Sequence, residues 1–111
     1  MASVDLKTQR IQQLDRCLEG HDVEIKRLFG ADGRAHGGKV FAMVTKHGEF
    51  VVKCDDDHQF HGLQDDGAQR WRPHPSRGPM GRWLVLTDEM LDVDGLVKAA
   101  LERCLLHLNT D

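Results

Sequence analysis

The fold of this chain is decided by residues 40–54, which read VFAMVTKHGEFVVKC. Residues 40–44 and 50–54 are two short runs rich in β-branched and aromatic side chains. Residues 46–49 connect them, and Gly48 is free to take a positive φ in this connection. The stretch therefore predicts two antiparallel strands joined by a tight hairpin.

The residues before this hairpin predict a helix, an extended segment and a loop. Ser3 is positioned to cap a helix that runs to about Glu19, and Gly20 follows where a C-terminal cap is common. Residues 23–29 change to the alternating pattern of a strand. Residues 30–38 carry four glycines and little that can pack, so we expect a loop there. The apolar positions are Val4, Ile11, Leu14 and Leu18 in the helix, then Val23, Ile25 and Phe29 in the extended segment.

A short helix and two further strands are predicted after the hairpin. Residues 55–57 are three aspartates, which suit the N-cap and first turn of a helix that Gly67 closes. Residues 68–72 and 82–87 read as strands, one on each side of a proline-containing loop. The apolar positions of the helix are Phe60 and Leu63, and the loop holds Pro73, Pro75 and Pro79.

A final helix is predicted from one continuous apolar stripe over about four turns, with Asp92 or Asp94 as its cap. The stripe consists of Val93, Leu96, Val97, Ala100, Leu101, Cys104, Leu105 and Leu108. The resulting order is α-β-β-β-α-β-β-α. It predicts an α+β fold in which helices pack on an antiparallel sheet.

The strand parity and the helical stripe also predict one core. Alternation along the strand puts Phe50 on one face with Val52 and Cys54, whereas Phe41 falls on the other face by the same count. The apolar face of the hairpin needs a partner, and the stripe of the final helix supplies one. We expect Phe50 and Val52 to share a core with Val97, Leu101 and Leu105.

Length and composition indicate a single domain over residues 1–111, with 40% hydrophobic and 30% charged residues. The formal charge of −3 argues against a surface built throughout for nucleic acid. Neither a membrane-spanning run nor a signal peptide is predicted. The cysteines are Cys17, Cys54 and Cys104, an odd number without a C-x-x-C motif, which favours buried thiols in the cytoplasm.

Two motifs have the spacing of ligand sites. Residues 33–39 have the G-x-x-x-x-G-K spacing of a phosphate-binding loop, but Val40 replaces the Ser or Thr that holds magnesium and a strand follows. His58 and His61 are three apart on a predicted helix beside the aspartates, a spacing at which a divalent metal could bind. That helix is short and polar, which favours solvated histidines. We therefore expect no metal and no cofactor.

The sequence also lacks a convincing catalytic set. Cys54 and Cys104 fall on apolar faces, and Ser76 has no nucleophile-elbow context. The carboxylates cluster at predicted helix starts and in loops, where capping and solvation account for them. We therefore expect no enzymatic activity.

The clearest electrostatic anomaly is the segment from Gly67 to Trp83. It has no acidic residue, and it contains His74, two tryptophans and the four candidate binding arginines Arg70, Arg72, Arg77 and Arg82. Arginine forks suit phosphates and carboxylates, and an exposed tryptophan could stack on a base. The alternative is that these arginines only keep an edge strand soluble while the tryptophans lie in the core.

Several of these segments resemble the N-terminal domain of the competence regulator TfoX, also called Sxy. They span residues 27–108 and are Arg27-Leu28-Phe29-Gly30, Gly38-Lys39-Val40-Phe41-Ala42-Met43-Val44, Phe50-Val51-Val52-Lys53-Cys54, Arg77-Gly78-Pro79-Met80 and Trp83-Leu84-Val85. The chain is more weakly similar to the MmcQ/YjbR group, to which a DNA-binding role has been ascribed. It departs from the TfoX pattern at Ala31, where a second glycine is common, and in the order Arg-Gly-Pro-Met.

The resemblance implies the same α+β architecture and a non-enzymatic regulatory role. It places no catalytic residue on this sequence. We therefore expect a stand-alone TfoX-like domain in the bacterial cytoplasm that acts through a protein partner or nucleic acid, without membrane contact. Two alternatives remain: direct DNA binding through the arginines of residues 67–83, and a small metal-dependent enzyme using His58 and His61.

Overall fold

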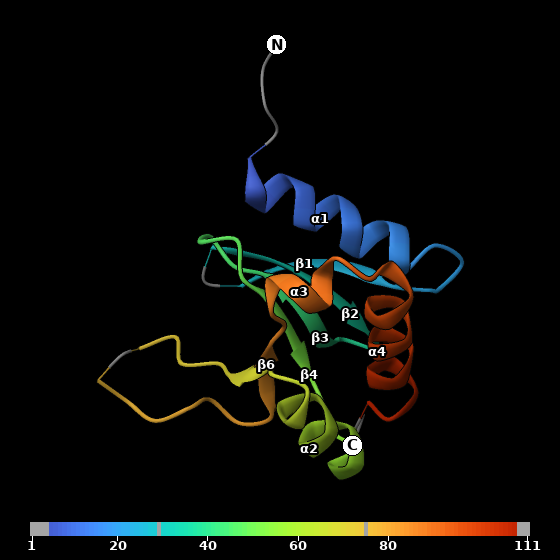
Figure 1. Ribbon diagram of the computed structural model, residues 1–111. Helices are drawn as coiled ribbons and strands as arrows, with labels where there is room; N and C mark the ends of the chain where they lie inside the picture. The colour runs from blue at the N-terminus through green and yellow to red at the C-terminus, as the bar shows by residue number, and fades with distance from the viewer. Residues whose placement is uncertain (1–4, 29, 75, 109–111) are drawn as a thin grey trace.

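The computed structural model describes residues 5–28, 30–74 and 76–108 (Figure 1). Over these residues, four helices accompany a six-stranded antiparallel sheet, which confirms the α+β class. The elements in chain order are α1 (Leu6–Cys17), β1 (Glu24–Leu28), β2 (Ala31–His36), β3 (Lys39–Val44), β4 (Phe50–Lys53), α2 (Asp57–Asp65), β5 (Gln69–Arg70), β6 (Trp83–Val85), α3 (Asp88–Leu91) and α4 (Asp94–Leu106).

The sheet has the strand order β1-β2-β3-β4-β6-β5. The predicted hairpin is confirmed, because β3 and β4 pair antiparallel with Val44 opposite Phe50 and Ala42 opposite Val52. Gly48 has a φ of 85° in the connecting turn, a conformation that strongly favours glycine. This hairpin forms the middle of the sheet.

One face of the sheet carries the main core, to which all four helices contribute. Phe50, Val52, Val97 and Leu101 are fully buried together, and Leu105 packs against them, as the sequence predicts. Cys54 and Cys104 are buried in the same cluster, so they are core residues. Helices α1 and α4 lie side by side and complete this layer.

Phe41 lies in this helix-side core, so its predicted position on the other face is wrong. The cause is a β-bulge between β2 and β3. Arg34 is opposite Ala42, but Ala35 is opposite Val40, so Phe41 is one residue too many for a regular ladder. A bulge interrupts strict alternation and turns an additional side chain toward the same face.

The glycine-rich stretch predicted as a loop is largely strand β2, and this prediction is wrong. Only Gly37 and Gly38, with φ values of 59° and 81°, form the turn into β3. At Gly33 a Cβ would lie 3.0 Å from the carbonyl oxygen of Lys26 and 3.2 Å from Cγ1 of Val40. The glycine thus lets three strands pack closely, and the sheet gains a strand that apolar patterning does not reveal.

Several predicted ends also move. Helix α1 begins after Asp5, which caps it through Thr8 N, whereas Ser3 and Val4 lie outside the described residues. Helix α4 has no side-chain cap, because its N-cap residue is Val93 rather than the predicted Asp92 or Asp94. Asp94 lies in the first turn and accepts hydrogen bonds from Gln13 and Arg16 of α1. Helix α3, capped by Thr87, has no counterpart in the sequence prediction. Phe29 and Pro75 also lie outside the described residues.

The opposite face of the sheet holds a second, smaller cluster. Its buried residues are Ala31, Met43, Val51, Trp71 and Trp83, and Val40 and Val85 pack against them. Among the described residues this cluster contains none from a helix. The long segment between β5 and β6 leaves the sheet at this side, as the yellow-to-orange trace at the left of Figure 1 shows. It covers part of the face and leaves a cleft beside it.

None of the helices in the described part of the chain is long and apolar enough to cross a membrane.

Candidate functional site

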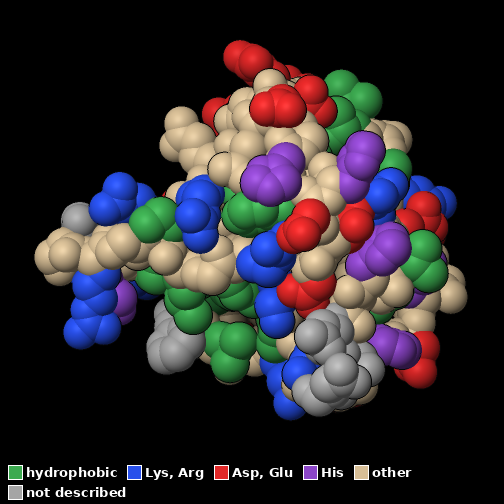
Figure 2. All heavy atoms as spheres, turned by 90° about the horizontal axis from the view of Figure 1, so that it is seen from below, with side chains coloured by type: hydrophobic (Ala, Val, Ile, Leu, Met, Phe, Trp, Pro, Cys, Tyr) green, Lys and Arg blue, Asp and Glu red, His purple; other side chains and the backbone are tan. Residues whose placement is uncertain are grey.

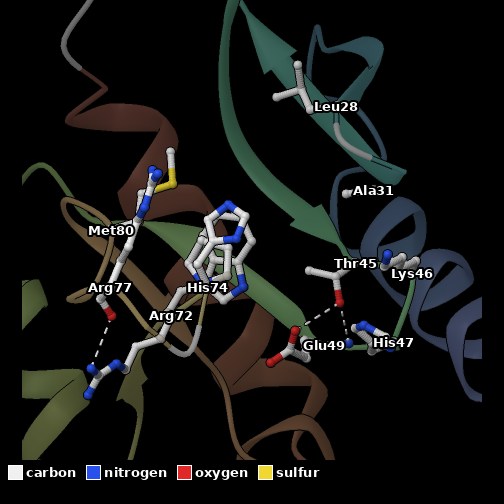
Figure 3. Close-up of a pocket in the computed structure, with 12 residues that line it drawn as sticks. Leu28, Ala31, Thr45, Lys46, His47, Glu49, Arg72, His74, Arg77 and Met80 are labelled. Carbon is white, nitrogen blue, oxygen red and sulfur yellow. Dashed lines mark hydrogen bonds between the residues drawn. The ribbon is translucent and has the colours of Figure 1, made fainter.

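A cleft of about 780 Å³ lies between the segment that joins β5 to β6 and the helix-free face of the sheet (Figure 3). Three separate parts of the chain form it: the β1–β2 corner, the β3–β4 turn, and residues 71–80. Its lining residues are Leu28, Ala31, Thr45, Lys46, His47, Glu49, Trp71, Arg72, Pro73, His74, Arg77 and Met80. We call this space the cationic cleft.

Apolar side chains lie at the base of the cationic cleft. Trp71 is buried edge-on against Trp83, with ring centroids 6.1 Å apart and an interplanar angle of 66°. Two backbone hydrogen bonds hold the ends of the segment together, Trp71 N to Trp83 O at 2.9 Å and Met80 N to Trp71 O at 2.8 Å. Ala31 belongs to the same buried cluster as both tryptophans and leaves room above it. The base is therefore apolar and fixed by the sheet.

Positive and titratable nitrogen groups surround this base. Lys46 and His47 come from the β3–β4 turn, and Arg72, His74 and Arg77 come from the long segment. Nη2 of Arg72 donates a hydrogen bond to the carbonyl oxygen of Arg77 at 3.1 Å, which holds the two arginines near each other.

Among the described lining residues, Glu49 alone carries a carboxylate. It accepts a hydrogen bond from the Thr45 hydroxyl at 3.1 Å, and the Thr45 hydroxyl oxygen accepts one from the Glu49 amide at the same distance. This carboxylate is thus tied to its own turn, and the cationic side chains outnumber it.

The arginines of the cationic cleft differ from most others in the molecule. Elsewhere an arginine commonly has a carboxylate partner, as where Nε of the buried Arg34 lies 2.7 Å from Asp15. The arginines with such partners are Arg10, Arg16, Arg27, Arg34, Arg82 and Arg103. In the part of the chain that the structure describes, Arg72 and Arg77 have none. The protein does not neutralise the charge of these two guanidinium groups, so they are available to bind an anion from solution.

The four arginines singled out by sequence fall into two pairs. Arg70 and Arg82 both lie over the Phe60 ring, with guanidinium carbons 5.5 and 4.6 Å from its centroid. Arg70 also donates to the carbonyl of Gly81 at 2.7 Å, and Arg82 binds the carbonyl of Cys54 at 2.8 Å and pairs with Asp57. Neither arginine of this pair lines the cationic cleft.

The structure thus brings Arg72 and Arg77 together and separates them from Arg70 and Arg82. Seen from below in Figure 2, Lys and Arg side chains lie both on the projecting arm at the left and near the centre. Arg70 lies on β5 and Arg72 after its end, so the two do not share a regular strand face.

The β3–β4 turn is the part of the site that sequence reasoning missed. Lys46 and His47 are exposed, and they appear in the sequence only as hairpin turn residues. The β4–β6 register sets this turn beside Leu86 and pairs Lys53, at the other end of β4, with Trp83. Lys46 and His47 share the cleft with the arginines because the long segment extends over the helix-free face of the sheet. Only the unusual density of polar side chains in that short turn could have indicated a role.

The other sequence candidates lie elsewhere. His58 and His61 are exposed on α2. In the stretches covered by the structure, no group of three or more His, Cys, Asp or Glu side chains is placed to hold a metal ion. Residues 33–36 belong to β2, residues 37–38 form the turn, and Lys39 begins β3, so a strand follows.

The buried thiols have a structural environment. Sγ of Cys54 lies 3.8 Å from Sγ of Cys104, and the latter also contacts Oε1 of Gln59. The hydrogen bond to Cys54, together with burial, raises the pKa of the Cys104 thiol well above its ordinary value. Burial likewise raises the pKa of Cys17. A reactive thiolate is therefore disfavoured at Cys17 and Cys104 at neutral pH.

Comparison with protein-family models found no family that matches this chain, and comparison with curated proteins found no significant relative.

Proposed function

We propose that this protein is a non-catalytic binding module and that its partner presents an anionic group to the cationic cleft. One observation carries the proposal: Arg72 and Arg77, without carboxylate partners among the described residues, line the same cleft with an apolar base as Lys46 and His47. Arginine recognises carboxylates and phosphates through paired N–H donors. Like charges held close together without a carboxylate repel each other, which disfavours folding. A bound anionic ligand would neutralise them and so explain their position.

The resemblance to the N-terminal domain of TfoX supports a regulatory role for this binding, in the bacterial cytoplasm and in the control of competence. The partner is then an acidic segment of another protein or a nucleic acid. The three cysteines are free and buried, which agrees with a reducing compartment. The described lining combines cationic side chains with an apolar base, which suits binding of an anionic group.

Direct DNA binding is the second candidate. In its favour, the described residues 67–74 and 76–83 carry no acidic side chain, and part of this segment projects from the sheet. Against it, both tryptophans are buried, which leaves neither ring free to stack on a base. The formal charge of −3 also disfavours a long nucleic-acid contact.

The test compares three fluorescent polymers, namely poly-glutamate, single-stranded DNA and double-stranded DNA, by anisotropy. We expect at least one to bind, and the Arg72→Gln/Arg77→Gln variant to bind it at least about tenfold more weakly. Arg16→Gln/Arg103→Gln is the matched control, because it removes the same charge from α1 and α4. For two phosphate contacts, DNA affinity should fall by about tenfold between about 50 and 200 mM salt.

Binding of poly-glutamate alone would support a protein partner, whereas binding of either DNA would favour the second candidate. If the wild-type protein binds none of the three polymers, or if both double variants bind alike, the proposed function is wrong.

A further inference from the structure

We infer that the cationic cleft is a site for a small organic anion with a flat apolar body, a ring-bearing carboxylate or phosphate. The inference uses the same cleft as the proposed function and deepens it. It names the class of compound that would occupy the cleft, either alone or as the terminal group of a partner. Size, shape and charge each support it.

The size is that of a small-molecule site. A volume of about 780 Å³ lies within the range of roughly 300–1,000 Å³ that is common for ligand pockets. The β1–β2 corner, the β3–β4 turn and residues 71–80 bound it on separate sides (Figure 3). A space bounded on three sides accommodates a compact group, either a free compound or the terminal group of a partner.

The apolar residues of the cleft come from two parts of the chain. Leu28 and Ala31 belong to the β1–β2 corner, and Trp71, Pro73 and Met80 belong to the long segment. Met80 is 44% exposed although it lines a cleft, so its thioether side chain is free to contact a ligand. Methionine makes favourable contacts with aromatic rings through its thioether sulfur. The short side chain of Ala31 leaves the space that such a ring requires.

Cationic side chains lie on two walls of the cleft. In Figure 3, Arg72, Arg77 and Met80 lie on the wall across the cleft from Lys46, His47 and Glu49. The hydrogen bond from Arg72 to the Arg77 carbonyl holds the guanidinium in place before any ligand binds. A donor that is already positioned loses less freedom on binding, which favours affinity for a carboxylate or a phosphate.

The experiment uses four probes on the full chain: 1-naphthyl phosphate, 1-naphthoate, the neutral 1-naphthol, and inorganic phosphate alone. Calorimetry gives the affinities, and ¹H–¹⁵N spectra locate the site. We expect the two naphthyl anions to shift the amide signals of Ala31, Thr45 and Met80. Inorganic phosphate should bind at least about tenfold more weakly than naphthyl phosphate, because it lacks the apolar body.

Two sets of variants test the contacts. Arg72→Gln/Arg77→Gln should weaken both naphthyl anions by about tenfold or more and change 1-naphthol binding by less than about twofold. Lys46→Glu, in an exposed turn on the opposite wall, should weaken the same anions independently of the arginine segment. Arg16→Gln/Arg103→Gln, which changes the same charge on the helix side, should leave all affinities unaltered.

A tighter complex with the phosphate or with the carboxylate assigns the headgroup, and either result supports the inference. It is overturned if neither naphthyl anion moves the three amide signals, if 1-naphthol binds as tightly as the anions, or if the cleft variants bind like the wild type. A failure here together with polymer binding would leave the proposed function standing. If the naphthyl anions bind and none of the polymers does, the small-anion inference stands and the proposed function is wrong.

Discussion

Arg82 and Arg72 belong to the same segment but have different surroundings. Arg82 is half-buried over the Phe60 ring, donates to the carbonyl of Cys54 and pairs with Asp57. Arg72 is exposed, and in the described residues its guanidinium donates a hydrogen bond to the carbonyl of Arg77 and pairs with no carboxylate. At the residue scale, the first is a structural arginine and the second is available to a ligand.

We therefore predict different stability effects for the two alanine variants. Arg82→Ala should lower the free energy of unfolding by about 1–2 kcal/mol, because it removes a hydrogen bond to a backbone carbonyl and cover from an aromatic ring. Arg72→Ala should change it by less than about 0.5 kcal/mol. Urea denaturation measures both values, and equal losses for the two variants would contradict the division of the arginines.

A second prediction concerns the leucines of α4. Leu101 is 0% exposed in the helix-side core, whereas Leu106 is 79% exposed. Leu101→Ala should cost about 2–5 kcal/mol of unfolding free energy, and Leu106→Ala less than about 0.5 kcal/mol. Thermal and urea unfolding provide the measurement. A Leu101→Ala protein with the wild-type melting temperature would show that α4 is placed incorrectly.

Strand β2 is the element in which composition and structure differ most. Its residues are small or polar, and the buried Arg34 is stabilised by Asp15 of α1, nineteen positions earlier in the chain. Gly33 allows close packing with both neighbouring strands.

Glycine substitutions test this account at the scale of the element. Gly33→Ala should destabilise the protein by about 1–3 kcal/mol, because its Cβ would press on the Lys26 carbonyl and on Val40. Gly62→Ala is the matched change in α2, where nothing lies within 4 Å of the added Cβ. It should stabilise the protein by about 0.4–1 kcal/mol. If chemical denaturation shows the same sign for both variants, β2 is not packed as described.

Elements formed by local apolar periodicity can be predicted from the sequence, whereas elements formed by contacts between distant residues cannot. The β3–β4 hairpin and helix α4 are predicted because their apolar periodicity is local and complete. Strand β2 is hidden because long-range pairing, rather than apolar alternation, makes it a strand. Phe41 is placed on the wrong face because a bulge depends on the neighbouring strand and leaves no mark in a single run of residues.

At the scale of the whole molecule, acidic side chains join the helices to each other. Asp94 at the start of α4 accepts hydrogen bonds from Gln13 and Arg16 of α1, and these contacts hold its pKa below the ordinary 3.8. Asp56 at the start of α2 accepts hydrogen bonds from Arg103 of α4, and its pKa is lowered chiefly by that arginine.

These shifts predict how stability depends on pH. A carboxyl group whose pKa is depressed in the folded state stabilises the protein above its unfolded pKa, and this contribution is lost as pH falls through the folded pKa. The melting temperature should therefore fall as pH drops from about 5 to about 3. Asp94→Asn should melt lower than the wild type at neutral pH and show a shallower fall in acid. Parallel curves for the two proteins would exclude this role for Asp94.

The cationic cleft could be predicted only in part, for a reason that belongs to the whole fold. The charge anomaly of residues 67–83 indicates Arg72 and Arg77, but it also includes Arg70 and Arg82, whose role depends on Phe60 of α2. Lys46 and His47 join the site because the long segment between β5 and β6 extends over the sheet face toward the β3–β4 turn. Which distant segments lie side by side depends on the topology of the fold, and the periodicity of residues along the chain does not specify topology.

The long segment that carries Arg72 and Arg77 has one more consequence, for limited proteolysis. Exposed loops are preferred sites of cleavage, and the Arg77–Gly78 bond offers trypsin a target in this one. An occupied cleft would engage the Arg77 side chain that the protease must bind. The rate of cleavage at the Arg77–Gly78 bond would then measure how much of the cleft is occupied. A ligand would be detected because it slows this cleavage of the native protein.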